Sequence, residues 1–265
     1  MRKIALFSCI HAGSQYAVLP PGIFDATGAE IKQNPAQVQL YRKWEEAGRI
    51  IASEKCDTII NFGDTIEGGN RKENANLLSL VTIDKQCEAA GKLLGPIVKG
   101  KKYYYIPGSA YHDSVDTKAD ANILSRVCPS NKDNSLGALA VVELVPGLRA
   151  FVTHGAGPGA KNRSTNIENY LVNLMVQAQR EQIDPVGLYI QGHLHTYRKV
   201  EANGMLGILV PAWKIITPDK IHLKNPTQML SDIGFVILTI HDKDRFDARK
   251  YLFGSPRVEL ATRKI

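Results

Sequence analysis

The sequence has few cysteines, and none of them are paired at the spacing of a metal or redox motif. Its 265 residues include only 4 cysteines, which lie far apart and form no CxxC pair: Cys9, Cys56, Cys87 and Cys128. A dense disulfide framework is therefore not expected. This usage is typical of a reduced cytosolic protein, so we expect a cytoplasmic location.

Long apolar runs are also missing. The apolar stretch near the N-terminus, residues 4–7, follows two basic residues but is too short for a secretory signal. No other stretch is apolar over the roughly 20 residues that a membrane-spanning helix needs. We therefore expect no membrane partner.

No sequence feature divides the chain into parts. It has no Pro/Ser/Gly-rich linker, internal repeat or low-complexity segment, and charged residues (22%) are interspersed with apolar ones (44%). Such a composition is typical of a chain that folds throughout. The length suits one α/β domain with a substantial core, so we expect a single domain over residues 1–265.

The charge balance is mildly basic, without a long basic tract. Lysine and arginine number 33 against 26 acidic residues, which gives a net charge of +7. This balance favours anionic partners without naming one. Nucleic acid is compatible with the sequence but not required by it, and the oligomeric state is left open.

Short apolar runs alternate with helical patterns over the first two thirds of the chain, which predicts strands joined by crossover helices. A first helix should begin after Asn34, because Pro35 and Gln37 follow it in a capping box. Further helices are expected over residues 74–98, 116–127 and 166–182. The expected strands cover residues 3–8, 58–62, 103–106, 138–145, 150–153 and 188–190.

After Gly192 the pattern changes to β-runs without helices, over residues 198–201, 205–210, 234–240 and 249–253. A βαβ half followed by a β-rich half predicts an α/β fold in which two mixed β-sheets pack face to face with flanking helices. Ligands in such folds lie at the carboxyl ends of strands. Functional residues are therefore expected just after the predicted strands.

Five of the 7 histidines follow these apolar runs, together with several acidic residues. Histidine and carboxylate groups bind divalent transition metals, so the pattern predicts a metal site assembled from five strand ends. If the segments are extended, the side chains of residues i and i+2 project to one side. Cys9 with His11, and His193 with His195, should therefore each direct a pair of side chains to one place. The five blocks are Cys9-Ile10-His11, Gly63-Asp64-Thr65-Ile66-Glu67, Gly108-Ser109-Ala110-Tyr111-His112-Asp113, His154-Gly155 and Gly192-His193-Leu194-His195.

In this order the blocks resemble the calcineurin-like metallophosphoesterases, whose pattern is D-x-H, G-D-x-x-D/E, G-N-H-D/E, H and G-H-x-H. The resemblance runs from residue 8 to residue 195. The flanking segments resemble phage- and prophage-borne members, with Pro20-Pro21 near the start and Pro211-Ala212-Trp213 after the last block. The ordered set is specific, whereas each block alone is not.

The resemblance implies a role for each residue and two bound divalent ions, which would be Mn, Zn or Fe. The first ion would be held by Cys9, His11 and His195, the second by His154 and His193, and Asp64 would bridge them. Ser109 stands at the position of a further ligand to the second ion. The resemblance places His112 by the scissile phosphate as a catalytic residue, and Asp113 is expected to orient it. Glu67 would fix the loop or a ligand histidine from outside the ligand set.

Two positions depart from the family pattern. Cys9 replaces the first aspartate, and a thiolate shifts the metal preference away from Mg²⁺ or Mn²⁺ toward Zn²⁺ or Fe²⁺. The alternative is that Cys9 does not coordinate and the first ion is weakly held. Ser109 replaces an asparagine, and a neutral hydroxyl coordinates less well, so water or a neighbour such as Asn70 could complete the second ion.

Substrate contacts are predicted at three further positions. Tyr111 could stack on a base or sugar, although packing is an equally good interpretation. Lys161 and Arg163 follow a Gly-rich stretch after His154 and could contact a phosphate. That stretch lacks the spacing of a P-loop, so a nucleotide-binding loop is not the main interpretation.

The resulting hypothesis is an enzyme, a metal-dependent phosphoesterase that hydrolyses phosphodiesters of nucleic acid or nucleotides by a metal-activated hydroxide. One alternative is a phosphomonoesterase or protein phosphatase, because the motifs are shared by both. The other is a non-catalytic binding module, in which Cys9 and Ser109 have dismantled the metal site. Metal content and hydrolysis distinguish these functions.

Overall fold

A computed structural model describes residues 1–25, 27–69, 76–112, 119–127, 134–155, 163–215 and 231–254. All ten predicted strands are present, and four helices accompany them in these residues. Their order is β1 Arg2–Phe7, α1 Pro35–Ser53, β2 Thr58–Asn61, α2 Ile83–Val98, β3 Lys102–Tyr105, α3 Ala119–Val127, β4 Leu139–Val145, β5 Leu148–Thr153, α4 Arg163–Gln179, β6 Leu188–Gln191, β7 Arg198–Ala202, β8 Met205–Leu209, β9 Ile233–Ile240 and β10 Phe246–Phe253.

The strands form two mixed five-stranded sheets. The first sheet has the order β10-β9-β1-β2-β3, and its three strands β1, β2 and β3 are parallel. The second sheet has the order β4-β5-β6-β8-β7, with β5, β6 and β8 parallel. Antiparallel strands form both edges of the second sheet and the β10 edge of the first, whereas the other edge of the first sheet is the parallel strand β3. The predicted class of fold, two mixed sheets with flanking helices, is confirmed.

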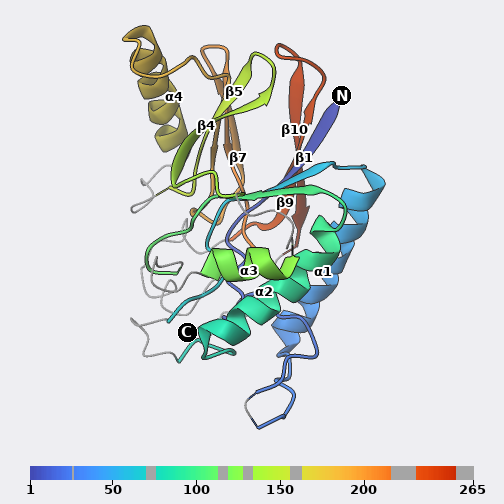
Figure 1. The fold of residues 1–265 in the computed structure, drawn as a ribbon. Coiled ribbons are helices and arrows are strands. Elements are labelled where there is room, and N and C mark those ends of the chain that lie inside the picture. The colour runs from blue at the N-terminus through green and yellow to red at the C-terminus, as the bar shows by residue number, and fades with distance from the viewer. Residues whose placement is uncertain are drawn as a thin grey trace, which may run out of the picture.

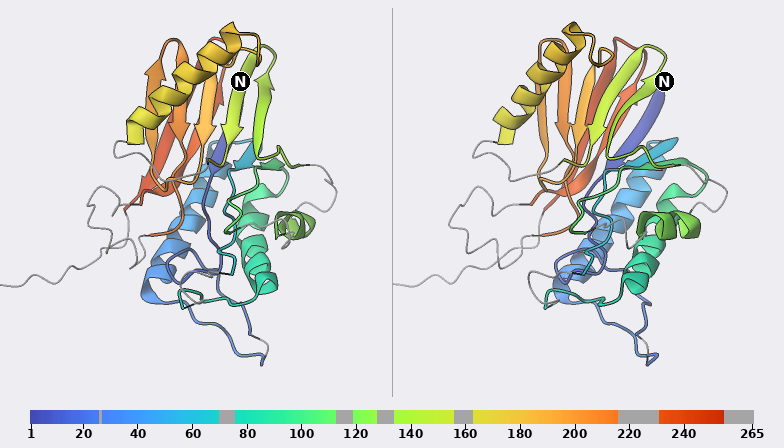
Figure 2. Two further views of the ribbon diagram at one scale, coloured as in Figure 1. Left: turned by 90° about the vertical axis from the view of Figure 1, so that its left-hand side faces the viewer. Right: turned by 60° about the vertical axis from the view of Figure 1, so that its left-hand side comes forward.

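The alternation of side chains along β1 explains the layers. Ile4 and Leu6 lie in a core between the two sheets, whereas Ala5 and Phe7 lie in a second core beneath α1 and α2. A third core lies between α4 and the second sheet. Figure 1 shows the resulting succession from α4 on the left, through the two sheets, to α1 and α2 at the lower right, and Figure 2 shows α4 lying across the face of the second sheet.

The helix boundaries follow local chemistry where caps are present. The capping box at the start of α1 forms as predicted, because Asn34 accepts from the Gln37 backbone and the Gln37 side chain accepts from the Asn34 backbone. The predicted start of the second helix at residue 74 is wrong. It begins at Ile83, after the N-cap Thr82, because the preceding backbone pairs with residues 13–15 instead. Within the described residues no helix combines the length and apolarity that crossing a membrane requires.

Candidate metal centre

The predicted ligands lie directly after four parallel strands, two in each sheet. Cys9 and His11 follow β1 and Asp64 follows β2 in the first sheet, whereas His154 follows β5 in the second. His193 and His195 follow β6, also in the second sheet. The carboxyl ends of the strands therefore meet where the two sheets adjoin, and the structure brings all six side chains into one cluster.

The backbone at these positions is unusual. Of the eight non-glycine residues with positive φ in the described residues, five belong to the cluster: Cys9, His11, Asp64, His193 and His195, with φ between 50° and 67°. Such conformations are costly for L-residues and accumulate at functional sites. They also show that our expectation of extended segments was wrong. The i and i+2 residues sit in left-handed turns, and His193 and His195 turn to different neighbours rather than to one place.

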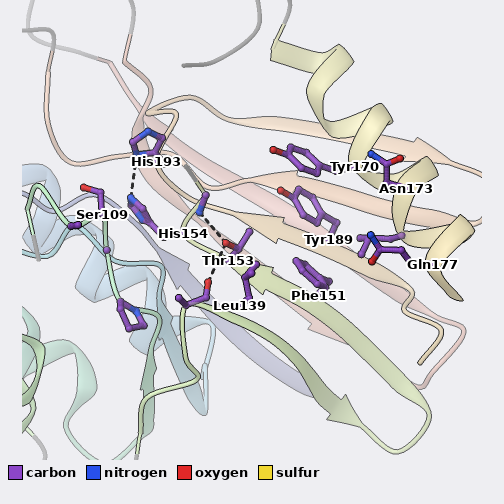
Figure 3. Close-up of a pocket in the computed structure, with 16 residues that line it drawn as sticks. Ser109, Leu139, Phe151, Thr153, His154, Tyr170, Asn173, Gln177, Tyr189 and His193 are labelled. Carbon is purple, nitrogen blue, oxygen red and sulfur yellow. Dashed lines mark hydrogen bonds between the residues drawn. The ribbon is translucent and has the colours of Figure 1, made fainter. Parts of the chain in front are cut away.

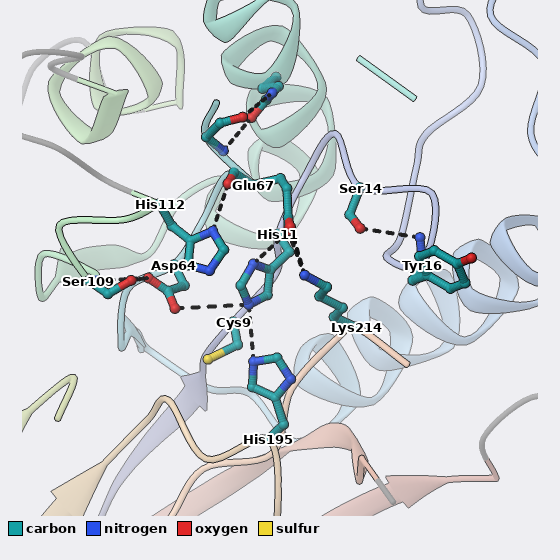
Figure 4. Close-up of polar contacts among 12 residues, drawn as sticks. Cys9, His11, Ser14, Tyr16, Asp64, Glu67, Ser109, His112, His195 and Lys214 are labelled. Atoms are coloured by element: carbon teal, nitrogen blue, oxygen red, sulfur yellow. Dashed lines mark hydrogen bonds and ion pairs between the residues drawn. The ribbon is translucent and has the colours of Figure 1, made fainter. Parts of the chain in front are cut away.

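His11 and His195 form one half of the cluster. Their Nε2 atoms lie 3.0 Å apart although both rings are buried, at 1% and 7% exposure. Two ligands of one Zn²⁺ at bond lengths of 2.0–2.1 Å and a tetrahedral angle are about 3.3 Å apart. The pair is therefore spaced as two ligands of one cation would be (Figure 4).

Asp64, His154 and His193 form the other half. Asp64 Oδ2 lies 3.0 Å from His154 Nε2, and His154 Nε2 lies 3.2 Å from His193 Nδ1. His154 Nδ1 donates to the carbonyl of Phe62, which can only accept, so the Nε2 of a neutral His154 carries the lone pair. These three groups are thus spaced and oriented as ligands of a second cation.

The Asp64 carboxylate lies between the two halves. Its Oδ2 is 3.9 Å from His11 Nε2 and 3.9 Å from His193 Nδ1. Burial raises the pKa of Asp64, but the close contacts with His154 and His193, together with the adjacent His112, hold the pKa well below its ordinary value. The carboxylate is therefore ionised, as a bridging ligand must be.

Cys9, like Asp64, lies close to the ligand atoms of both halves of the cluster. Its Sγ lies within 4.8 Å of the ligand atoms of His11 and His195, and also within 4.8 Å of those of Asp64 and His154. The side chain is fully buried, and Ser8 Oγ lies 3.0 Å from Sγ. A soft sulfur among nitrogen ligands favours Zn²⁺ or Fe²⁺ at the His11 half.

Ser109 contacts the bridging carboxylate. Its backbone N–H and its hydroxyl both donate to Asp64 Oδ1, at 2.8 and 3.0 Å. These bonds occupy the oxygen that faces away from His154 and fix the rotation of the carboxylate (Figure 4). The predicted coordination of an ion by Ser109 stays a prediction.

Glu67 contacts His11 from the side opposite the cluster. Its Oε2 lies 3.0 Å from His11 Nδ1, so it fixes the ring and leaves Nε2 as the ligand atom. Lys214 donates to both Glu67 oxygens at 2.8 Å. Lys214 was missed in the sequence analysis, although it directly follows the noted segment Pro211-Ala212-Trp213. The available signal was its position at the end of an apolar run over residues 205–213.

His112 lies on the open side of the cluster. Its Nδ1 donates to the Glu67 carbonyl at 2.6 Å, which leaves Nε2 of the neutral ring as an acceptor. The ring meets His11 edge to face, with centroids 4.5 Å apart, and a ring nitrogen lies within 4.8 Å of ligand atoms of His11 and Asp64. It is half-buried, so a substrate can reach it.

The remaining predicted residues are placed only in part. Tyr111 packs edge to face on the ring of His112, with centroids 4.8 Å apart. Asp113, Lys161 and Asn70 lie outside the described residues, as does the side chain of Arg163. Their predicted roles stay predictions.

Two glycines allow the strand ends to approach closely. A Cβ on Gly63 would lie 2.6 Å from Gly108 Cα, and Gly63 also has a φ of +78°. A Cβ on Gly192 would lie 2.3 Å from Ser8 Oγ and 2.8 Å from the Phe62 carbonyl. No larger residue fits at either position without displacing the backbone that carries the cluster.

Comparisons with known proteins give likenesses in structure only. No protein-family model and no curated protein matches the sequence. A novel archaeal phosphodiesterase is similar with a TM-score of 0.48 and 13% identity, over 95% of this chain and 99% of that chain. The phosphoesterase YfcE from E. coli has a TM-score of 0.45 and 13% identity, over 89% and 88%. Vps29 from Entamoeba histolytica complexed with Zn²⁺ has a TM-score of 0.43 and 12% identity, over 95% and 99%.

Proposed function

We propose that the protein is a metal-dependent phosphoesterase that hydrolyses phosphodiesters. One observation carries this proposal: two groups of nitrogen, oxygen and sulfur donors lie side by side and share the buried Asp64 and Cys9. Nitrogen, carboxylate and thiolate donors gathered at this spacing suit divalent transition-metal cations. Adjacent divalent cations suit displacement at a phosphate.

The chemistry supplied by two bound divalent cations is neutralisation of the phosphate and activation of a water for attack on phosphorus at neutral pH. Asp64 and a Cys9 thiolate cancel only part of the charge, so about two positive charges remain for the anionic ester. The Glu67 carboxylate adds no net charge because Lys214 neutralises it.

The protein's own residues orient the reaction. His11 is held by Glu67 and His154 by the Phe62 carbonyl, so both rings present Nε2 to the centre. His112 is held through Nδ1 by the Glu67 carbonyl, so its Nε2 is the atom that can take up a proton from water and then deliver it to the leaving oxygen.

The substrate class follows from charge. A net charge of +7 favours polyanionic esters, and we infer nucleic acid or a nucleotide as the substrate. A role for Lys161 and Arg163 in phosphate binding, and the likeness of the flanking segments to phage-borne proteins, belong to this proposal as further predictions.

Metal content and hydrolysis test the proposal together. The purified protein should hold two equivalents of Zn²⁺, Fe²⁺ or Mn²⁺, and should hydrolyse bis-p-nitrophenyl phosphate faster than p-nitrophenyl phosphate. His112→Ala should lose turnover, whereas His241→Ala, at an exposed turn after β9, should retain it. Faster monoester turnover would identify a phosphomonoesterase. No metal and no turnover with any added metal would leave a binding module.

A further inference from the structure

A cavity of about 630 Å³ adjoins the second half of the metal centre. Ser109, His154 and His193 belong to both, so a group bonded to a phosphate at the centre reaches directly into the cavity. Its other walls come from the second sheet, from α4 and from the segment after β3 (Figure 3). We refer to this cavity as the aromatic pocket, after Phe151, Tyr170 and Tyr189 in its lining.

The aromatic pocket has a mainly apolar lining. Among the described residues that line the aromatic pocket, none is Asp, Glu, Lys or Arg, and most of the lining is apolar. Phosphate groups are bound by Lys, Arg or backbone N–H groups, and a buried charge without a partner is costly. The part of the substrate that enters this pocket is therefore uncharged.

Three aromatic rings form a ladder along one wall. The rings of Phe151 and Tyr189 stack with centroids 6.1 Å apart at 20°, since the two residues pair across β5 and β6. Tyr170 on α4 stacks on Tyr189 at 5.2 Å and 16°. Tyr189 is 2% exposed but Tyr170 is 42% exposed, so the ladder ends in a ring that is open to a ligand. Flat rings gain from such stacking beyond the area they bury.

Polar groups on α4 lie on the same side of the pocket. Tyr170, Asn173 and Gln177 are spaced i, i+3 and i+7, so they share the helix face that covers the sheet. The amides of Asn173 and Gln177 each offer both donors and acceptors. In Figure 3 Asn173 lies beside Tyr170 and Gln177 beside Tyr189, so their amides can meet the edge of a ring that packs on the aromatic wall.

We propose that the aromatic pocket binds a flat, uncharged aromatic ring of the ester, whose phosphate lies at the metal centre. This inference rests on the proposed phosphoesterase function and narrows its substrate to esters that carry such a ring. A nucleobase and a simple aryl group share this chemistry. A nucleic-acid strand would lead its base, and not its backbone, into the pocket.

The test compares phosphonates that differ only in the attached group. Methyl-, cyclohexyl- and phenylphosphonate are titrated into the metal-loaded full-length protein by calorimetry, together with thymidine 5′-phosphate. Phenylphosphonate should bind about ten-fold more tightly than methylphosphonate and more tightly than cyclohexylphosphonate. Tighter binding of thymidine 5′-phosphate than of phenylphosphonate identifies a nucleobase as the natural ring, and the reverse identifies an aryl group.

Variants on α4 locate the effect. Tyr170→Ala should remove most of the preference for phenyl- over methylphosphonate, and Tyr170→Phe should keep it. Asn173→Trp, at an exposed helix position, should abolish the preference because the larger side chain fills the pocket. Val172→Ala is the matched control, since Val172 is 47% exposed on the same helix but does not line the pocket. Thermal unfolding checks that each variant folds.

The outcomes separate the two proposals. Metal-dependent methylphosphonate binding and diester hydrolysis, with equal affinity for the methyl, cyclohexyl and phenyl compounds, would overturn the aromatic pocket and leave the phosphoesterase function standing. A phenyl preference that Tyr170→Ala and Asn173→Trp leave unchanged would overturn it as well. Absence of bound metal, phosphonate binding and turnover would overturn the proposed function, and this inference with it.

Discussion

Lys214 Nζ lies 2.8 Å from both oxygens of Glu67, in a position where the two side chains are 9% and 2% exposed. The same carboxylate contacts His11 Nδ1 at 3.0 Å. Lys214 thus acts on the metal centre through one intermediate side chain, and it joins the segment after β8 to the loop after β2.

Lys214→Met should therefore destabilise the protein strongly, because it leaves the Glu67 carboxylate buried without its partner. We expect a loss of about 3–5 kcal/mol in the free energy of unfolding, measured by urea titration. Metal affinity should fall about 10–100-fold, since His11 loses its fixed orientation. Lys199→Met is the control, because Lys199 pairs with Glu201 and Asp247 at the surface and should cost at most about 1 kcal/mol. Equal losses in the two variants would contradict the assigned role.

Cys9 should determine which metal is bound. A cobalt-loaded wild-type protein is expected to show a thiolate-to-cobalt charge-transfer band in the near ultraviolet, and Cys9→Ser should lack it. Cys9→Asp should shift uptake from Zn²⁺ toward Mn²⁺ when the two metals compete, because a carboxylate is the harder ligand. Cys87→Ser is a suitable control, since Cys87 is equally buried but packs between α2 and α3. A wild-type cobalt spectrum without the band would show that Cys9 does not coordinate.

His112→Asn should slow hydrolysis without emptying the centre. We expect kcat for diesters to fall about 10²–10⁴-fold with unchanged metal content, and the loss should be larger for an alkyl than for a p-nitrophenyl leaving group. A variant that loses one equivalent of metal would instead identify His112 as a ligand, which its position near His11 and Asp64 also permits. His241→Asn, on the exposed turn after β9, should leave both metal content and kcat unchanged.

The left-handed backbone at His193 should be costly in the metal-free protein. After glycine, asparagine is a residue that visits the left-handed region routinely, and His193 has a φ of 67°. His193→Asn should raise the stability of the metal-free protein by up to about 1 kcal/mol and lower the affinity for the second metal. Differential scanning calorimetry in EDTA measures the first effect and metal titration the second. A lower melting temperature without metal would contradict the strain argument.

Glu54, which caps α1, gives stability a dependence on pH. Hydrogen bonds from Lys3 and Tyr251 lower the pKa of the Glu54 carboxyl in the folded state, and the positive charges of Lys3 and Arg249 lower it further. A lowered folded-state pKa stabilises the protein above the unfolded value of about 4.3, and this contribution is lost as pH falls below it. Glu54→Gln should therefore cost up to about 1 kcal/mol at pH 7 and much less at pH 3. A cost that is the same at both pH values would contradict this assignment.

The strands were predictable from sequence because each is a short run bounded by local signals. In β1 the apolar residues Ile4 and Leu6 alternate with Ala5 and Phe7, which are also apolar, and this pattern already implies a core on each face of the strand. The start of α2 was not predictable, because the residues before Thr82 form tertiary pairs with residues 13–15. A local helical pattern gives no information about such a partner.

The same limit applies to the site. The blocks around His11, Asp64 and His195 could be recognised in the sequence as an ordered set of metal-ligand candidates. They converge in the structure because each follows a parallel strand, and the carboxyl ends of these strands lie at the same edge. The left-handed turns could not be predicted from the sequence, since histidine and cysteine do not indicate a positive φ as glycine does. Lys214 was missed because its partner Glu67 lies 147 residues away.

The division of the proposed ligands between the two sheets would make metal uptake depend on both sheets being assembled. His11 and His195 are 184 residues apart in sequence, and neither sheet alone offers both. Contacts of such separation form late and slowly, so a nascent or truncated chain has at most half a centre and only weak affinity for metal. A metal bound at the proposed centre would link the two sheets, and its binding free energy would add to the stability of the folded state.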